Sequence, residues 1–267
     1  ISDPRFKFVY DDNPDFNVIP GIGDPQMLFL ANNVSRMKHG TKLGTRIVEV
    51  HNGSSLFTGD AGGGESNLRR FIIENDMLEA IIAMPEKDFY NTGIGTYIWI
   101  VTNRKEARRK GKVQLIDATA IKTPLRKNLG EKNCETNDDD RKKILDLLMA
   151  FEENEYSKIF PNEEFGYWEV ELFKPAKDES GNVIKDKKGK VKMAKVKGEV
   201  EQIPFTYPGG IEAFHKNEVL PYEPEEAFGE PTIGYELSFT KYFYKPVQLR
   251  SIAEITADIR DIEKSTE

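Results

Sequence analysis

The sequence predicts an α/β fold, and three observations support this prediction. Between residues 24 and 37, apolar side chains recur at helical spacing, at positions 27, 28, 30, 31 and 34. A short β-branched strand is expected at residues 45–50, and the apolar runs at residues 78–84 and 96–102 are typical of buried strands. Between the first two strands we expect a helix that begins at Ser66 as its N-cap and runs to residue 76. The order strand, helix, strand, strand is typical of an α/β layer.

Later elements continue this pattern and then change it. A further strand is expected at residues 112–117, and Asn137-Asp-Asp-Asp140 predicts the start of a helix that runs to Phe151, because acidic residues stabilise a helix N-terminus. The Lys-rich stretch 174–197 alternates apolar and polar residues between turn sequences, which predicts a solvated β-hairpin. The chain closes with isoleucines at positions 252, 255, 259 and 262, the spacing of an amphipathic helix.

Composition narrows the classes of function. The 267 residues hold 45 acidic and 38 basic side chains, a net charge of −7, which counts against free-standing nonspecific nucleic-acid binding. No apolar run approaches the roughly 18 residues of a membrane span. The single Cys134 excludes an internal disulfide framework, and His39, His51 and His215 lack the spacing of metal ligands. We therefore expect a soluble cytoplasmic protein without a metal.

A glycine-rich stretch, Gly59-Asp-Ala-Gly-Gly-Gly64-Glu65-Ser66, matches a P-loop except at Glu65, where a lysine should meet the phosphates of a nucleotide. A carboxylate there would repel phosphate, so nucleotide hydrolysis is not expected. Two alternatives stay open: a flexible loop ahead of a helix, or a mobile loop, centred on Gly62, Gly63 and Gly64, that closes over a substrate. The adjacent Arg69 and Arg70 are candidate phosphate contacts.

Two further stretches each allow two interpretations. Phe89 and Tyr90 lie in the loop between two predicted buried strands, where they either fold back onto the core or serve as a stacking platform. The lysines of residues 185–197 either track phosphates or form a solvated hairpin face, and the second is favoured because no aromatic residue is interleaved to stack on bases.

Many stretches, in family order, resemble the modification subunit of type I restriction-modification systems. They include Leu56-Phe57-Thr-Gly-Asp-Ala-Gly-Gly-Gly-Glu-Ser66, Arg69-Arg70, Glu74-Asn75-Asp76, Leu78-Glu-Ala-Ile-Ile-Ala83, Phe89-Tyr-Asn-Thr-Gly-Ile94, Thr96-Tyr-Ile-Trp-Ile100, Gly111-Lys-Val-Gln-Leu-Ile-Asp117, Phe151-Glu-Glu-Asn-Glu-Tyr-Ser-Lys158, Val219-Leu-Pro-Tyr222 and Gly234-Tyr-Glu-Leu-Ser-Phe-Thr-Lys-Tyr-Phe-Tyr244. The resemblance implies an S-adenosylmethionine-dependent DNA adenine-N6 methyltransferase with a Rossmann-like domain. It also implies duplex DNA as substrate, and a specificity subunit and a restriction subunit as partners.

The resemblance suggests roles for several residues. It implies that Phe89 or Tyr90 packs against a flipped adenine, and that Gln26 and Phe29 help line the adenosine pocket. His51, Asn52 and Ser54, at the exit of the strand at residues 45–50, would face the same crevice. The closing helix would pack against the specificity subunit, although a helix folded back on its own domain stays open.

The departures from the family are equally informative. The glycine-rich cofactor motif and the Asn-Pro-Pro-aromatic tetrad lie, in the family, upstream of the segment that resembles Asp3-Pro-Arg-Phe-Lys-Phe8, and neither occurs here. Asn13-Pro-Asp-Phe16 is on the wrong side of that landmark and is expected to be a polar turn. We therefore expect a carboxy-terminal part of a modification subunit that is inactive alone. The alternative is a non-catalytic assembly or DNA-clamp module.

The expected organisation has four parts. Residues 1–125 would form the second half of the methyltransferase sheet, and residues 126–171 a helical connection. Residues 172–250 would form a smaller mixed α+β region with a hairpin, and residues 251–267 the partner-binding helix.

Overall fold

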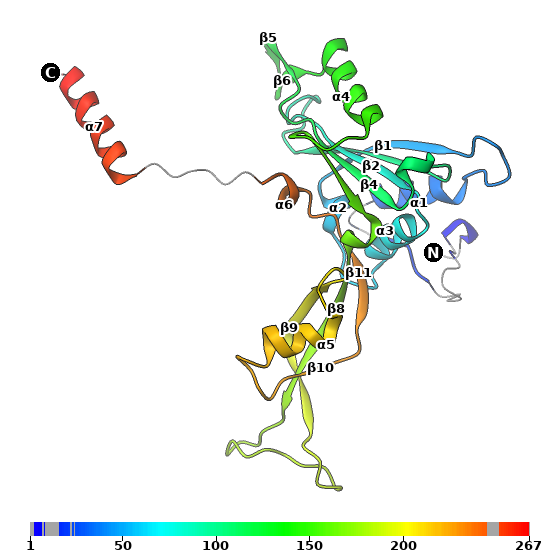
Figure 1. Ribbon diagram of the computed structural model, residues 1–267, viewed down its shortest axis with the longest axis vertical. Helices are drawn as coiled ribbons and strands as arrows, with labels where there is room; N and C mark the ends of the chain where they lie inside the picture. Colours follow the sequence, from blue (N-terminus) through cyan, green and yellow to red (C-terminus); the bar gives the residue numbers. More distant parts are fainter. Residues whose placement is uncertain are drawn as a thin grey trace.

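The chain folds around a mixed five-stranded sheet (Figure 1). The structure is a computed structural model that describes residues 3–6, 8, 16–21, 23, 25–244 and 251–266, so residues 13–15 of the turn expected at residues 13–16 lie outside the described residues. β2 and β4 pair in parallel, and the other neighbours pair antiparallel. In spatial order the strands are β1 (Arg46–Asn52), β3 (Thr96–Thr102), β2 (Leu78–Ala83), β4 (Lys112–Asp117) and β7 (Ser157–Pro161). The α/β class is thus confirmed.

Helices cover both faces of this sheet (Figure 1). On one face, α1 (Gln26–Ser35) and α3 (Gly64–Glu74) bury a large apolar cluster that includes Leu30, Ile72 and Trp99. On the other face, α4 (Asp138–Ala150) contributes Ile144 to a smaller cluster with Ile82 and Ile116. All six residues of β2 are buried, as the mostly apolar composition of this run predicts for a central strand, and the one charged residue among them is Glu79.

The start of α3 differs from the prediction. The helix begins at Gly64 with Gly63 as its N-cap, three residues before the expected cap at Ser66. A Cβ atom on Gly64 would lie 1.8 Å from the carbonyl oxygen of Ile19, so only glycine allows this approach of two backbone segments. Ser66 is instead fully buried, and its hydroxyl accepts a hydrogen bond of 2.9 Å from the amide of Tyr235. Tertiary packing, and not local capping, explains this serine.

Residues 126–171 contain more than the expected helical connection. The predicted helix is present as α4, and Asn137 caps it in a capping box with Asp140. The same stretch also holds the end of a hairpin, a strand of the main sheet and the start of β8. The hairpin is formed by β5 (Thr123–Leu129) and β6 (Lys132–Glu135). Its strands are short and mostly polar, so hydrophobic periodicity could not reveal them.

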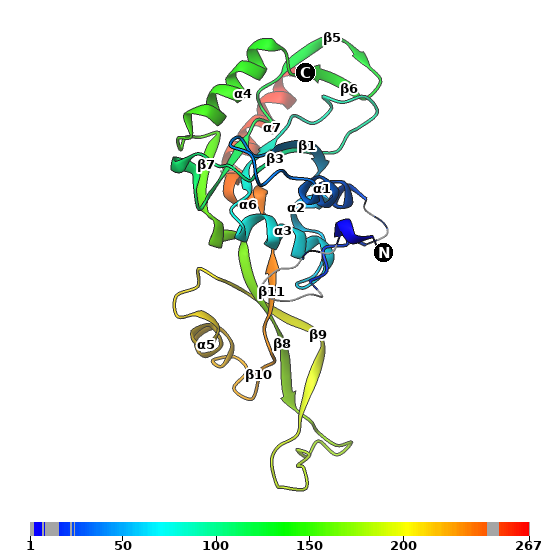
Figure 2. The ribbon, with the colours of Figure 1, turned by 90° about the vertical axis from the view of Figure 1, so that its right-hand side faces the viewer.

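A second, smaller sheet extends from the body as an arm (Figure 2). The expected hairpin at residues 174–197 is confirmed but is only the outer part of a longer antiparallel pair. The strands of this sheet are β8 (Gly166–Pro175), β9 (Met193–Pro204), β10 (Ala227–Phe228) and β11 (Thr232–Tyr235). Short helices complete the description: α2 (Ser54–Phe57), α5 (Gly210–Phe214), α6 (Phe239–Phe243), the 3-10 turns Pro4–Phe6, Ala107–Arg109 and Asn162–Phe165, and a π-helical turn at His215–Val219.

The closing amphipathic helix is confirmed as α7 (Ile252–Thr266). It stands apart from the sheet and its covering helices in Figure 1. Ile252, Ile255 and Ile259 on its apolar stripe are all exposed. Within the described residues, therefore, the helix does not fold back to bury this stripe on its own domain.

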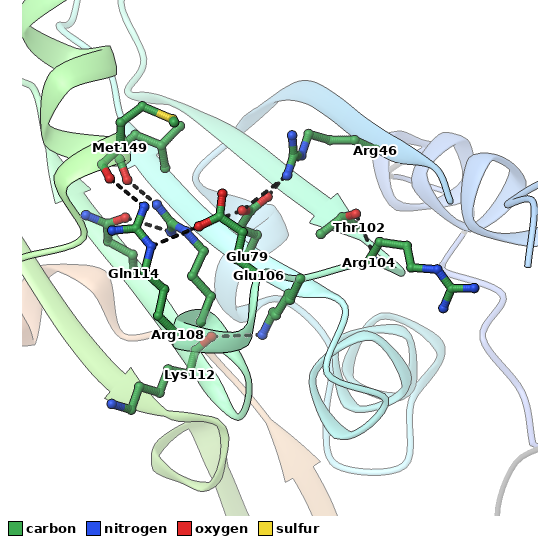
Figure 3. Close-up of polar contacts among 12 residues, drawn as sticks. Arg46, Glu79, Thr102, Arg104, Glu106, Arg108, Lys112, Gln114 and Met149 are labelled. Carbon is green, nitrogen blue, oxygen red and sulfur yellow. Dashed lines mark hydrogen bonds and ion pairs between the residues drawn. The ribbon is translucent and has the colours of Figure 1, made fainter. Parts of the chain in front are cut away.

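A polar network joins the sheet to α4 at the end of the sheet where β2 and β4 begin (Figure 3). The buried carboxylate of Glu79 on β2 pairs with Arg46 at 3.0 Å and with the buried Arg109 at 3.5 Å. Arg108, Arg109 and Gln114 donate to the last four carbonyl groups of α4, those of Leu147, Leu148, Met149 and Ala150. Side chains from outside the helix thus satisfy the carbonyl groups that a helix C-terminus leaves unpaired.

Candidate functional site

The loop between β2 and β3, residues 84–95, presents two aromatic side chains to solvent. It leaves β2 at the carboxyl end of that strand, where functional loops of α/β sheets tend to lie. Phe89 is 40% exposed and Tyr90 is 64% exposed. Neither ring is folded into the core, so the structure leaves both available for contact with a partner molecule.

Asp88, whose side chain is 9% exposed, anchors this loop. The carboxylate of Asp88 accepts hydrogen bonds from the Thr136 hydroxyl at 2.6 Å and the Thr136 amide at 3.2 Å. It also forms an ion pair with Lys132 at 3.1 Å, and the same ammonium lies 5.9 Å from the centre of the Tyr90 ring. The hairpin β5–β6 therefore holds the residue next to Phe89 and Tyr90 in place.

Sequence analysis did not identify these anchors. Thr136 and Lys132 lie more than forty residues beyond Asp88 along the chain. The same hairpin adds two weaker contacts, from the Cys134 thiol to the Glu86 carbonyl at 3.3 Å and from the Asn133 amide to the Lys87 carbonyl at 3.2 Å. The one local signal for such an anchor is an acidic residue, Asp88, directly before two aromatic residues in a loop.

The structure brings Gln26 together with Asn52 and Ser54, three of the residues expected around one crevice. The Gln26 amide donates to the Asn52 side-chain oxygen at 2.8 Å and to the Ser54 hydroxyl at 2.7 Å, and its own oxygen accepts from the Asn52 amide at 2.9 Å. Phe29, one turn later on α1, is 66% exposed. The cluster joins the start of α1 to the exit of β1.

His51 is separated from this crevice by its burial. One ring nitrogen, Nε2, lies 3.0 Å from the carboxylate of Glu49, and the ring packs 5.7 Å from that of Trp99. The other nitrogen, Nδ1, is buried with no hydrogen-bond partner among the described residues. The residue belongs to the helix-covered face of β1.

The glycine-rich loop lies at the root of the arm. A Cβ atom on Gly62 would come within 3.1 Å of the Thr232 side chain on β11, and Gly63 begins α3. Glu65 is buried, and its carboxylate accepts a hydrogen bond of 2.7 Å from the Gly21 amide. A buried carboxylate at this position repels nucleotide phosphates, in agreement with the exclusion of a P-loop.

Arg69 and Arg70 have different environments. The Arg69 guanidinium is fully buried and donates to the carbonyl oxygens of Tyr235 at 2.6 Å, Thr58 at 2.9 Å and Ser55 at 3.1 Å. Desolvation lowers the pKa of Arg69 to about 10, so the guanidinium stays charged at neutral pH. In this position it cannot contact a phosphate, and it ties the arm to α3 instead. Arg70 is half-buried and pairs with Glu74 at 3.2 Å.

An aromatic cavity of about 300 Å³ lies at the carboxyl ends of β2 and β4, and sequence analysis did not identify it. Tyr97 and Phe239 meet edge to face at 5.4 Å, and Phe239 stacks on Phe243 at 4.9 Å. Burial raises the pKa of Tyr97, and the charges of Asp117 and Glu86 raise it further. The phenol therefore stays neutral. Because α6 reaches the sheet from a distant part of the chain, no local pattern announces this cavity.

The described part of the chain contains neither a metal-binding cluster nor a membrane-spanning helix. No three His, Cys, Asp or Glu side chains there come together in a group that could hold a metal ion. Nor is any described helix both long enough and apolar enough to cross a membrane.

Comparison with known proteins matches this arrangement to one family. The sequence profile of the N-6 DNA Methylase family matches residues 9–172. The type I restriction enzyme MjaVII methylase subunit of Methanocaldococcus jannaschii is 37% identical over 109 residues, which cover 39% of this chain and 18% of that protein. The MjaIX methylase subunit of the same organism is 35% identical over 95 residues, 36% of this chain and 16% of that protein.

A methyltransferase subunit of a type I restriction-modification system from Streptococcus thermophilus, whose crystal structure is known, is 22% identical. That alignment covers 61% of this chain and 30% of that one, with a TM-score of 0.48. The chain thus spans less than a third of the length of each of these proteins. Because the family profile matches more than half of its residues, the chain belongs to the N-6 DNA Methylase family.

Proposed function

We propose that this chain is part of a modification subunit that transfers a methyl group from S-adenosylmethionine to N6 of adenine in duplex DNA. It would act in the cytoplasm, within a type I restriction-modification complex. Family membership and similarity to type I methylase subunits support this proposal. The observation that carries it is the loop of residues 84–95, in which hydrogen bonds from Thr136 fix Asp88 and the neighbouring Phe89 and Tyr90 are exposed.

In this proposal Phe89 or Tyr90 stacks on an adenine that has been extruded from the duplex. Base-modifying enzymes must take their target out of the stack, and an aromatic face offers the extruded base a replacement for its lost stacking partners. A rigid anchor helps, because an already ordered platform loses little entropy on binding. Gly62 and Gly63, together with Arg70, would contact the DNA beside it, whereas Gly64 is buried against Ile19 and is not available for such a contact.

We propose that the residues present here supply only part of the cofactor site. Gln26, Asn52 and Ser54 form hydrogen bonds with one another at the start of α1 and the exit of β1. Gln26 and the exposed Phe29 would supply one wall of the adenosine pocket. The cofactor motif and the Asn-Pro-Pro-aromatic tetrad are absent from these 267 residues, so we propose that the chain alone does not catalyse transfer.

The edge of the main sheet supports the same view. β1 is the edge strand, and Val48 and Val50 on one of its faces are exposed although both are apolar. An apolar edge strand is a template for pairing with another strand. We propose that residues 1–125 form the second half of a Rossmann-like sheet that is completed at β1. Residues 126–171 would connect it to the arm region 172–250.

The exposed stripe of α7 would bind a partner. Ile252 and Ile259 are 84% and 51% exposed, and an amphipathic helix with an open apolar face is suited to packing against other helices. In this proposal residues 251–267 dock on the specificity subunit, which reads the DNA sequence, and a restriction subunit joins the same complex.

Methyl transfer by the parent complex tests the proposal. The modification subunit that contains this chain is assembled with its specificity subunit, and transfer of radioactive methyl from S-adenosylmethionine to a duplex containing the target is measured. Phe89→Ala and Tyr90→Ala are compared with Tyr222→Ala, which removes an even more exposed aromatic side chain from the arm region. We expect at least one loop variant to lose most activity and the control to keep it. Unchanged transfer in both loop variants would refute the stacking role and favour a non-catalytic clamp module.

The cofactor claim has its own test. The 267-residue chain is heated with and without S-adenosylmethionine, and its unfolding temperature is compared. Because the cofactor site is incomplete, no stabilisation is expected, and a clear rise would contradict the claim, since a ligand that binds the native state stabilises it.

A further inference from the structure

The arm built by β8 and β9 projects away from the main sheet and ends in a pair of loops (Figures 1 and 2). The ten residues of β8 at about 3.3 Å each give a stalk roughly 33 Å long. The inner part of this hairpin buries Val170, Leu172 and Ile203, whereas residues 177–192 at its outer end are exposed and bury no apolar side chain. The exposed outer part of the arm is therefore a candidate binding surface.

Each of the two loops at the tip is a compact turn closed by an aspartate. Asp178 accepts hydrogen bonds from the amides of Ser180 and Asn182, both at 2.9 Å. Asp186 does the same for the amides of Lys188 and Lys190, at 2.7 and 2.9 Å. In the first loop Gly181 has φ of +84°, and in the second its counterpart, the residue after Lys188, has φ of +78°.

The two turns therefore share one pattern, an aspartate followed three residues later by a glycine. Backbone hydrogen bonds lower the pKa of Asp178, which keeps that carboxylate charged and engaged in its turn. The first loop reads Asp-Glu-Ser-Gly-Asn and the second Asp-Lys-Lys-Gly-Lys. Their shared geometry shows that the turn itself does not require the lysines of the second loop.

Charge is concentrated at this tip. Residues 174–197 hold nine lysines and three acidic residues, a net charge of +6 in a chain whose net charge is −7. Closer to the body the stalk is acidic, with Glu169 and Glu171 on β8 and Glu199 and Glu201 on β9. The positive charge is therefore separated from the rest of the molecule along the arm.

Among the nine lysines, only two, one on β8 and one on β9, form ion pairs with described residues. Lys174 pairs with Glu226 at 2.9 Å, and Lys195 pairs with Glu171 at 2.5 Å. The other seven side chains are exposed, and none of them forms an ion pair with any described residue. They are Lys177, Lys185, Lys187, Lys188, Lys190, Lys192 and Lys197. Like charges this close repel one another, so they destabilise the free arm and favour an anionic partner.

We propose that this basic tip binds the phosphate backbone of duplex DNA, outside the site of methylation. The inference rests on the proposed function, which brings DNA to the molecule. Lysine carries a compact charge that neutralises phosphate without reading bases, and the stretch 174–197 holds no arginine and no aromatic residue. The lack of aromatic rings counts against single strands, whose bases need stacking platforms. The arm thus adds sequence-independent affinity that the acidic body does not provide.

Fluorescence anisotropy with a labelled random-sequence 40-base-pair duplex tests this directly on the 267-residue chain, between 50 and 200 mM salt. One variant combines Lys187→Gln, Lys188→Gln, Lys190→Gln and Lys192→Gln. Its matched control combines the same change at four exposed lysines of the body and the helical turn beside the arm: Lys42, Lys110, Lys142 and Lys216. We expect the control to bind like the unchanged chain. The arm variant should bind about tenfold or more weakly at 100 mM salt, with a salt slope smaller by about 0.9 for each lost phosphate contact.

A second variant protects against a folding artefact. Lys187→Glu, Lys188→Ser and Lys190→Asn together convert the second loop into the sequence of the first, which already forms this turn. It should lose affinity to a similar degree while its circular dichroism and unfolding temperature stay unchanged.

Three results would overturn the inference. The first is no measurable binding by the unchanged chain, and the second is equal binding by the arm variants and the control. The third is that polyglutamate displaces the labelled duplex more effectively than unlabelled duplex does at equal charge concentration, which would indicate an acidic protein partner. Anisotropy requires neither cofactor nor methyl transfer. A chain that binds DNA through the arm while its parent complex fails to methylate would refute only the proposed function.

Discussion

Replacing Glu79 by glutamine tests whether the network of Figure 3 holds the sheet and α4 together. Glu79 is buried on β2, and its carboxylate faces Arg46 at 3.0 Å and Arg109 at 3.5 Å. Arg46 is half exposed and can be hydrated after the change, whereas the side chain of Arg109 is only 2% exposed. The Glu79→Gln variant therefore leaves a buried guanidinium without its counter-charge.

The magnitude follows from that burial. Removing one partner of a buried ion pair costs about 3–5 kcal/mol, because the remaining charge stays desolvated. Arg109 keeps its hydrogen bond of 3.0 Å to Gln114 and its position 4.4 Å from the centre of the Phe151 ring, which favours the lower end of that range. With a urea dependence near 3 kcal/mol per molar, we expect the midpoint of unfolding to fall by about 1 M.

Urea unfolding followed by Trp99 fluorescence measures this shift. Trp99 is fully buried in the same sheet, and a Trp168→Phe background removes the only other tryptophan. Glu106→Gln is the control, since Glu106 pairs with the neighbouring Arg108 at 2.8 Å but both side chains are about half exposed. Its midpoint should hardly change, because solvent screens exposed pairs. Equal midpoints for the Glu79 and Glu106 variants would refute the reasoning.

Three further predictions concern other parts of the molecule. Arg69→Met leaves three carbonyl groups without their donor, at a cost of about 1 kcal/mol or more each. The unfolding temperature should therefore fall by about 6–12 °C. A fall no larger than that of Arg70→Met would contradict this prediction. Asp88→Asn removes the ion pair to Lys132, so amide hydrogen exchange in residues 85–95 should be faster than in the exposed control variant Asp138→Asn. Equal exchange rates in the two variants would refute the anchoring role of Asp88. Burial raises the pKa of Tyr167 to about 12, so folding favours its neutral form. The stability that this provides is present below pH 10 and is lost as pH rises from about 10 towards 12. Absorbance at 295 nm should then show a late ionisation that disappears in Tyr167→Phe, and its persistence in that variant would assign it elsewhere.

Local patterns predicted most of the elements. The apolar run of β2, the alternation of the arm and the N-terminus of α4 all appear where the sequence predicts them. Ser66 shows the limit of this approach, because its hydroxyl serves a strand that lies 169 residues away, and no local preference contains that information. The hairpin β5–β6 was missed for the related reason that short polar strands carry almost no hydrophobic period.

The candidate site likewise combines features that the sequence predicts with features that only the tertiary structure reveals. Residue types and their order along the chain were enough to identify the family and to single out Phe89, Tyr90 and Gln26. Tertiary structure alone decided that Arg69 is buried and that Asp88 is anchored. It also brought the aromatic side chains of α6 to the ends of β2 and β4, where the cavity lies. The physical reason is that helical and strand periods reflect contacts within a few residues, whereas burial, charge pairing and cavities depend on which distant segments meet.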